Sequence, residues 1–88
     1  MDNQRAATFH MFERYKEILQ NQDFDGPDKT SAAHLRWMCD EALGSDYPVD
    51  KLSRWLGFVQ GVLIMHGVTT VDAERDYSRP LFKPESNG

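Results

Sequence analysis

The segment WLGFVQGVLIMHG, residues 55–67, is the most apolar stretch of this chain of 88 residues. Its apolar residues recur at helical spacing, which predicts a helix from residue 48 or 49 to residue 66, closed by Gly67. Gly57 and Gly61 lie inside this helix, four residues apart. Because a glycine within a helix costs about 1 kcal/mol relative to alanine, the pair indicates that another backbone approaches closely on their side.

This helix has an ordinary core stripe on one side and the glycines on the other. The stripe consists of Leu52, Leu56, Val59 and Leu63, and the glycines are flanked by Phe58, Ile64 and Met65. Because the helix is apolar nearly all round, we expect it to be central and covered on its glycine side as well. The cover is either another part of the same chain, which is the commoner arrangement, or a second subunit. Within the chain, the first helix, the fourth helix and the tail are the candidates.

Trp37 favours the subunit interface. It lies off the apolar stripe of its own helix, and exposed aromatic residues off the core face are frequent anchors of interfaces. We therefore predict a homodimer or a higher homo-oligomer. The predicted interface consists of Trp37, Gly57, Phe58, Gly61, Ile64 and Met65.

Two amphipathic helices precede this segment. Residues 3–22 place seven apolar residues on one side, namely Ala7, Phe9, Met11, Phe12, Tyr15, Ile18 and Leu19, and leave His10, Glu13, Arg14 and Glu17 on the other. Residues 29–43 form the second helix. Asp28 is placed to cap its start, and Gly44 is placed to end it in a left-handed conformation.

A short fourth helix is predicted over residues 69–79. Thr69 or Thr70 caps it, acidic residues in its first turn favour its positive end, and Pro80 stops it. The predicted fold is all-α: a small domain resembling a three-helix bundle, with a short fourth helix, over residues 1–79. Residues 80–88 are expected to be an extended or disordered tail.

The composition excludes several classes of protein. Fourteen acidic residues against ten Lys and Arg give a net charge of −4, which argues against a nucleic-acid-binding protein. The longest aliphatic run, residues 62–65, is far shorter than the ~20 residues that span a membrane. The start of the chain has no secretory signal, and the single cysteine, Cys39, fits a reducing compartment. We expect a soluble cytoplasmic protein.

Motifs for catalysis or metal binding are missing from the sequence. His34 and Cys39 lie five residues apart and so turn to different sides of a helix, and no CxxC or HxxxH pair occurs. His10, Glu13 and Glu17 share one face, which is expected to be a solvated polar face. The chain also lacks a glycine-rich phosphate loop and a nucleophile motif. We therefore predict no catalytic residues, no metal and no cofactor.

A polar cluster in the fourth helix is the one candidate for a polar site. Arg75 and Arg79 lie four residues apart and share a face, with Tyr77 between them. These charges either pair with neighbouring acids to stabilise the helix, or they form a guanidinium fork for a phosphate or for a partner's carboxylate. In the second case Arg75, Tyr77 and Arg79 are the binding residues. Four apolar residues, Val71, Tyr77, Leu81 and Phe82, are expected to dock this helix against the third one, leaving both arginines outside.

Three blocks of the sequence, HLRWMCDEAL, PVDKLSRWLGFVQGVLIMHGV and VDAERDYSRPLF, resemble a group of small uncharacterised proteins encoded by bacteriophages and prophages. The resemblance covers roughly residues 33–82. It implies a viral accessory protein made in a bacterial cytoplasm. Small phage proteins of this size often bind and inhibit a host protein or sequester a small signal. Together with the negative charge, the missing catalytic motifs and the spare apolar surface, this favours a protein that acts by protein–protein interaction, with a host bacterial protein as the candidate it inhibits. The alternative function is an oligomeric module that binds a nucleotide or another phosphate-bearing ligand.

Overall fold

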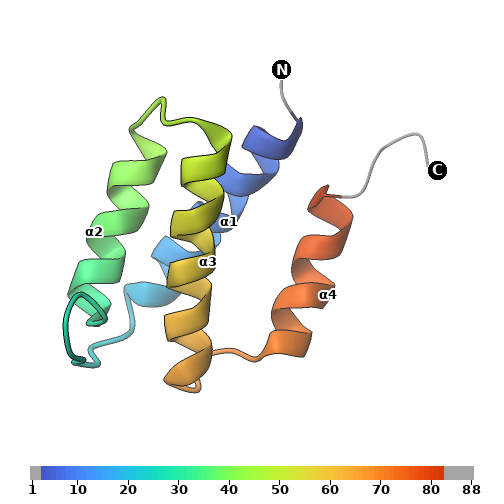
Figure 1. The fold of residues 1–88 in the computed structure, drawn as a ribbon. Helices are drawn as coiled ribbons and strands as arrows, with labels where there is room; N and C mark the ends of the chain where they lie inside the picture. Colours follow the sequence, from blue (N-terminus) through green and yellow to red (C-terminus); the bar gives the residue numbers. More distant parts are fainter. Residues whose placement is uncertain (1–2, 83–88) are drawn as a thin grey trace.

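The computed structural model describes residues 3–82, which form four α-helices (Figure 1). The helices are α1 (Asn3–Leu19), α2 (Ala32–Leu43), α3 (Val49–Met65) and α4 (Val71–Phe82). The described part of the chain contains no strand, so the predicted all-α fold is confirmed.

The central helix is α1, because it packs against α2, α3 and α4 (Figure 1). It carries several of the largest fully buried side chains, namely Met11, Phe12, Tyr15 and Leu19. The core stripe predicted for α3 is confirmed by Leu52, Val59 and Leu63, which are buried, while Leu56 is half-buried. The prediction that α3 is central and covered all round is wrong: this helix packs against α1 and α2 only on its core side.

The second helix begins later than predicted. Asp28 and Lys29 have φ angles of +43° and +68°, so both belong to the turn, and Ser31 caps α2 by accepting a hydrogen bond from the His34 N–H. Gly44 follows α2 with a φ of −94°, so the prediction that it adopts a left-handed conformation is wrong. The backbone N–H of Gly44 still donates to the Asp40 carbonyl, which closes the last turn without a positive φ.

The expected end of α3 is confirmed at Gly67, whose φ of +74° is the left-handed conformation that glycine adopts without strain. After it, Thr70 caps α4 by accepting a hydrogen bond from the Ala73 N–H. The fourth helix then runs through Pro80 to Phe82, beyond the predicted end at residue 79. Pro80 removes only one hydrogen bond in the last turn, and Leu81 packs against the core there. Of the predicted tail, residues 83–88 lie outside the described residues.

Within residues 3–82, none of the helices has the length and apolar character needed to cross a membrane.

Candidate interaction surface

The glycines of α3 lie on an uncovered surface. Gly57 and Gly61 are exposed, and a Cβ atom built on either of them would meet no atom within 4 Å. Neither α1 nor α4 covers them, so the expectation that one of these helices packs over the glycines is wrong. The tail from residue 83 onward lies outside the described part of the chain. Packing within residues 3–82 therefore does not account for the two glycines.

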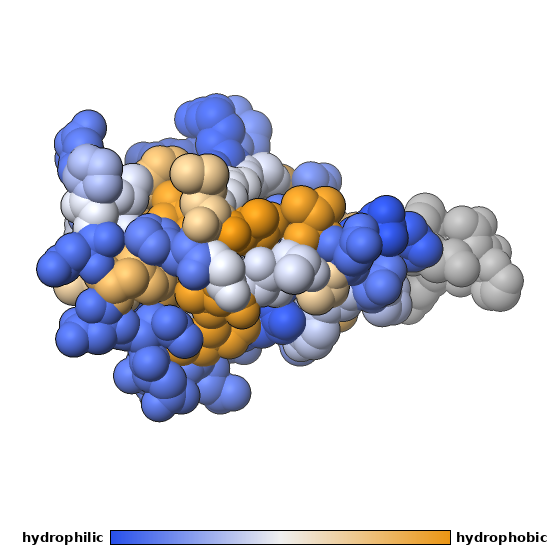
Figure 2. Space-filling view, turned by 90° about the horizontal axis from the view of Figure 1, so that it is seen from below, coloured by the Kyte–Doolittle hydropathy of each residue, from blue (hydrophilic) through white to orange (hydrophobic). Residues whose placement is uncertain are grey.

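Large apolar side chains surround the glycines. Met65 is 86% exposed and Phe58 is 41% exposed, while Ile64 is half-buried. We call Gly57, Gly61, Ile64 and Met65 the glycine side of α3. At the end of the molecule where α3 finishes, apolar side chains form a band across the middle, bordered by hydrophilic ones (Figure 2).

A groove with an apolar floor runs along the outer seam between α2 and α3. Trp37 and Met38 of α2 face Trp55 and Phe58 of α3 across it, and Lys29, His34 and Arg54 complete its lining. Its volume of about 650 Å³ lies within the ~300–1,000 Å³ range of pockets that hold small ligands. We call these seven residues the aromatic groove.

A row of rings follows this seam. The Tyr47 and Trp55 rings lie 5.5 Å apart, Trp55 and Trp37 6.0 Å apart, and Trp37 and His34 5.4 Å apart, measured between ring centroids. The Lys51 ammonium group lies 3.7 Å from the centre of the Tyr47 ring and 5.5 Å from that of Trp55. These ring contacts pack Trp37 and Trp55, two of the four floor residues, against neighbouring side chains.

The six predicted interface residues therefore belong to two adjacent surfaces. Trp37, which is 51% exposed, lies in the aromatic groove on the α2 side of α3. Gly57 and Gly61 lie on the far side of Phe58, because residues 55 and 57 are separated by about 160° around a helix of 3.6 residues per turn. Phe58 lies between the two surfaces and borders both of them.

In the predicted polar site on α4, the structure separates Tyr77 from Arg75 and Arg79. The Arg75 guanidinium lies 3.4 Å from an Asp72 oxygen and 3.7 Å from an Asp76 oxygen, at the surface. Arg79 is also exposed, as expected. Tyr77 turns away from both arginines toward α1. Its hydroxyl is 2.9 Å from His10 Nε2, and the Arg14 guanidinium lies 4.1 Å from its ring centre.

The mode of α4 docking also differs from the prediction. Val71 is 61% exposed and takes no part in docking, and the helix packs on α1 instead of α3. The main anchor is Glu74, which is 1% exposed. The sequence predicts a different role for the acidic residues of this first turn, that of favouring the positive end of the helix. The spacing of Glu74, three from Tyr77 and seven from Leu81, puts it on the inward face of α4, and this spacing is the signal that identifies it.

The Glu74 carboxylate is surrounded by donors from two segments, α1 and the connection between α3 and α4. Arg14 Nη1 lies 2.7 and 2.9 Å from its two oxygens, and the hydroxyls of Tyr15 and Thr69 also donate to it. Gln60 of α3 donates to the Tyr15 hydroxyl at 2.9 Å. We call these five residues the Glu74 network. Arg14 was expected on a solvated face, but it is half-buried because it reaches back to this carboxylate.

The network holds Glu74 in its charged form. Burial by itself raises the pKa of Glu74, but hydrogen bonds from Thr69, Tyr15 and Arg14, together with the Arg14 charge, outweigh it and lower the pKa below its ordinary value. Burial and the Glu74 hydrogen bond raise the pKa of Tyr15. Both groups therefore keep their usual protonation at neutral pH, and the carboxylate is engaged by donors on both oxygens. This arrangement is suited to anchoring a helix and leaves no free group for general acid–base chemistry.

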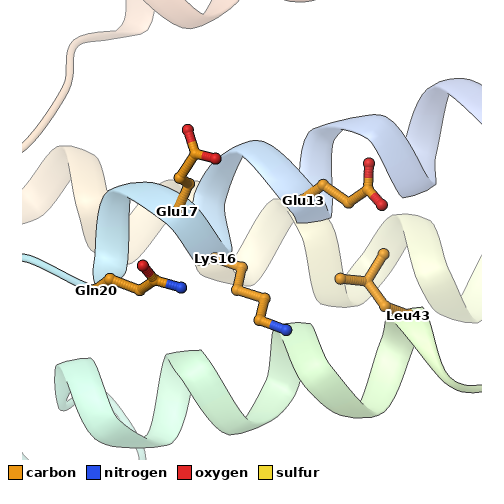
Figure 3. A pocket seen from close by; sticks show the side chains of 5 residues that line it. All are labelled: Glu13, Lys16, Glu17, Gln20 and Leu43. Carbon is orange, nitrogen blue, oxygen red and sulfur yellow. The ribbon is translucent and has the colours of Figure 1, made fainter.

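Two further features are a buried cysteine and a shallow hollow. Cys39 is buried, and burial raises the pKa of its thiol to about 12, which disfavours the reactive thiolate at neutral pH. A shallow hollow between α1 and α2 is lined by Glu13, Lys16, Glu17, Gln20 and Leu43 (Figure 3). Lys16 extends toward α2, where it pairs with Asp40 at 2.7 Å, while Glu13 and Glu17 turn away from it. Within residues 3–82, no cluster of His, Cys, Asp and Glu has the arrangement of a metal site.

Comparison of the chain with protein-family models, with curated proteins and with solved structures finds no match.

Proposed function

We propose that this protein acts by binding other proteins and catalyses no reaction, with the outer surface of α2 and α3 as its binding surface. The observation that carries this proposal is the exposure of Trp37 in the aromatic groove, and of Phe58 and Met65 beside glycines that nothing in residues 3–82 covers. Gathered apolar side chains on a protein surface mark sites of interaction. Trp37 and Phe58 belong to the residue types enriched in protein interfaces.

A second copy of the chain is the proposed occupant of the glycine side. Open space at Gly57 and Gly61, one helical turn apart, permits two α3 helices to cross with their backbones close together. Phe58, Ile64 and Met65 then close around the crossing. Association also helps a chain of 88 residues, because a domain of this size buries a limited fraction of its own surface.

Sedimentation equilibrium over a range of protein concentrations tests the homodimer. We expect the wild type to dimerise and the Gly57→Leu/Gly61→Leu variant to be monomeric, because leucine side chains prevent the close approach. An Arg79→Leu variant adds an apolar side chain to α4, away from this surface, and is the matched control that should still dimerise. A wild type that remains monomeric at every concentration contradicts the homodimer.

Besides a second copy of the chain, the proposed partner is a protein of a bacterial host. This protein is bound in the cytoplasm and inhibited by the binding. The resemblance of residues 33–82 to phage accessory proteins supports this choice. We expect the wild type to capture one stoichiometric protein from bacterial lysate and a Trp37→Ala/Phe58→Ala variant to lose it. The Arg75→Gln/Arg79→Gln variant is the control that retains it. Capture that survives loss of both aromatic residues places the binding surface elsewhere.

A module for a nucleotide or another phosphate is the alternative, and it has weaker support. Arg75 and Arg79 are exposed on α4, but Asp72 and Asp76 already flank Arg75 and compete with a phosphate for it. A thermal-shift screen with nucleotides and Mg²⁺ separates the two functions. A ligand present at 100 times its dissociation constant adds about 2.7 kcal/mol of stability, and loss of that shift in Arg75→Gln/Arg79→Gln favours the alternative.

A further inference from the structure

We infer that the aromatic groove binds an acidic amphipathic helix of a partner protein. This inference rests on the proposed interaction function and names the chemistry of the partner that fits the groove.

The shape of the groove suits a helix. α2 and α3 are neighbours that run in opposite directions, and α1 packs against both of them (Figure 1). Their outer seam has an apolar floor formed by Trp37, Met38, Trp55 and Phe58. A third helix lying along such a seam buries apolar residues spaced at i, i+3, i+4 and i+7, which is a recurring mode of peptide recognition.

The charge of the groove selects the partner. The chain has a net charge of −4, yet both charged residues that line the groove, Lys29 and Arg54, are cationic. Lys51 extends the cationic rim past Trp55. Arg54 approaches Asp50 at 3.7 Å, but both side chains are more than two-thirds exposed, so this pair is weak and leaves the guanidinium accessible. The complementary helix carries carboxylates beside its apolar stripe.

Two other occupants fit the groove less well. A symmetrical contact with a second copy brings Lys29 and Arg54 of both copies together, which like-charge repulsion opposes. A single strand of nucleic acid needs free ring faces on which to stack. Here the rings contact one another and Lys51 lies over the Tyr47 ring.

The protein contains only two tryptophans, Trp37 and Trp55, and both line the groove. Their indole N–H signals in an NMR spectrum therefore report on the groove directly. The probes are two synthetic peptides with the same leucine stripe at i, i+3, i+4 and i+7, one with glutamates on its flanks and the other with lysines. We expect the glutamate peptide to move both indole signals, with an affinity that falls as salt is added, and the lysine peptide to leave them in place.

Charge reversal sharpens the test. In Lys29→Glu/Arg54→Glu, two attractions become repulsions, so we expect binding of the glutamate peptide to weaken about tenfold and binding of the lysine peptide to appear. The matched control is Arg79→Glu, an exposed charge on α4 that should leave both titrations unchanged. The dispersion of the NMR spectrum shows whether each variant is folded, so a loss of binding is not confused with unfolding.

Several outcomes overturn the inference. They are equal binding of both peptides, no response to either peptide, indole shifts that depend on protein concentration alone, and a response to a single-stranded oligonucleotide in place of the glutamate peptide. If the peptides fail while the wild type still dimerises or captures a host protein through Trp37 and Phe58, only the acidic helix is wrong and the proposed function stands. If dimerisation and capture also fail, the interaction function itself is contradicted.

Discussion

The contact between α1 and α4 and the outer surface of α2 and α3 are built in opposite ways. Between α1 and α4, a charged residue, Glu74, is almost completely buried and receives hydrogen bonds from Arg14, Tyr15 and Thr69. On the outer surface, apolar side chains such as Phe58 and Met65 remain exposed to water. One region satisfies a polar group inside the protein, while the other leaves apolar groups without cover.

This difference separates residues that support the fold from residues available to a partner. A buried carboxylate is stable only when its donors are in place, so changing any member of the Glu74 network disturbs α4. Exposed apolar residues contribute little to the stability of the isolated chain, so changing them affects association instead. Substitutions in the two regions should therefore have effects of different kinds and sizes.

The largest effect is expected for Glu74→Gln. The substitution keeps the shape of the side chain but leaves the half-buried Arg14 without its ionic partner, which costs about 3 kcal/mol of folding free energy. Urea denaturation monitored by circular dichroism measures the loss. Asp72→Asn is the matched control, because this exposed acid of the same helix should change stability by less than about 1 kcal/mol. Equal stability of Glu74→Gln and wild type would show that α4 is held by other contacts.

The Glu74 network also predicts how the stability of the folded protein depends on pH. The pKa of Glu74 is lowered in the folded protein from its ordinary value of 4.5, so the folded state binds fewer protons than the unfolded state. The stability that the Glu74 carboxylate contributes is complete above the pKa that Glu74 has in the unfolded state. It is lost as the pH falls through the lower pKa that Glu74 has in the folded state. We expect the melting temperature of the wild type to fall below about pH 4.5 more steeply than that of Glu74→Gln.

The next largest effect is expected on the open surface, and it has the opposite sign. In Gly57→Ala/Gly61→Ala the new methyl groups meet no atom within 4 Å. Each alanine favours the helix by up to about 1 kcal/mol, so the monomer should become about 1–2 kcal/mol more stable. Denaturation at low protein concentration measures this gain, and sedimentation should show weaker dimerisation. Gly67→Ala is the control that should destabilise, because Gly67 has a φ of +74°. A destabilised Gly57→Ala/Gly61→Ala monomer would mean that these glycines are covered within the chain.

The smallest effect is expected for Arg75→Gln/Arg79→Gln. Arg75 forms only exposed ion pairs with Asp72 and Asp76, so the circular dichroism and the melting temperature should stay nearly unchanged, with less than about 1 kcal/mol lost. Thermal denaturation checks this expectation. Unfolding of this variant would place the two arginines in a structural role comparable to that of Arg14.

Much of the secondary structure could be predicted from the sequence, because local rules decide it. The spacing of Met11, Phe12, Tyr15 and Leu19 identifies the buried face of α1, since a helix brings residues three and four apart to one side. Gly67 identifies the end of α3 for an equally local reason. The errors at Asp28 and Gly44 arose where several local conformations were available and the neighbouring turn selected another one.

The sequence by itself therefore determined the number of helices, their apolar stripes and the outward direction of Trp37, Arg75 and Arg79. Only the tertiary structure decided which helix covers which. Helical periodicity assigns a face to each helix but does not say which helix lies against it, and so α1, not α3, became central. The pairing of Arg14 with Glu74 joins residues sixty positions apart. In the sequence, each of them looks like an ordinary charged residue exposed to solvent. Burial of the pair becomes favourable only because the folded chain brings the two side chains together.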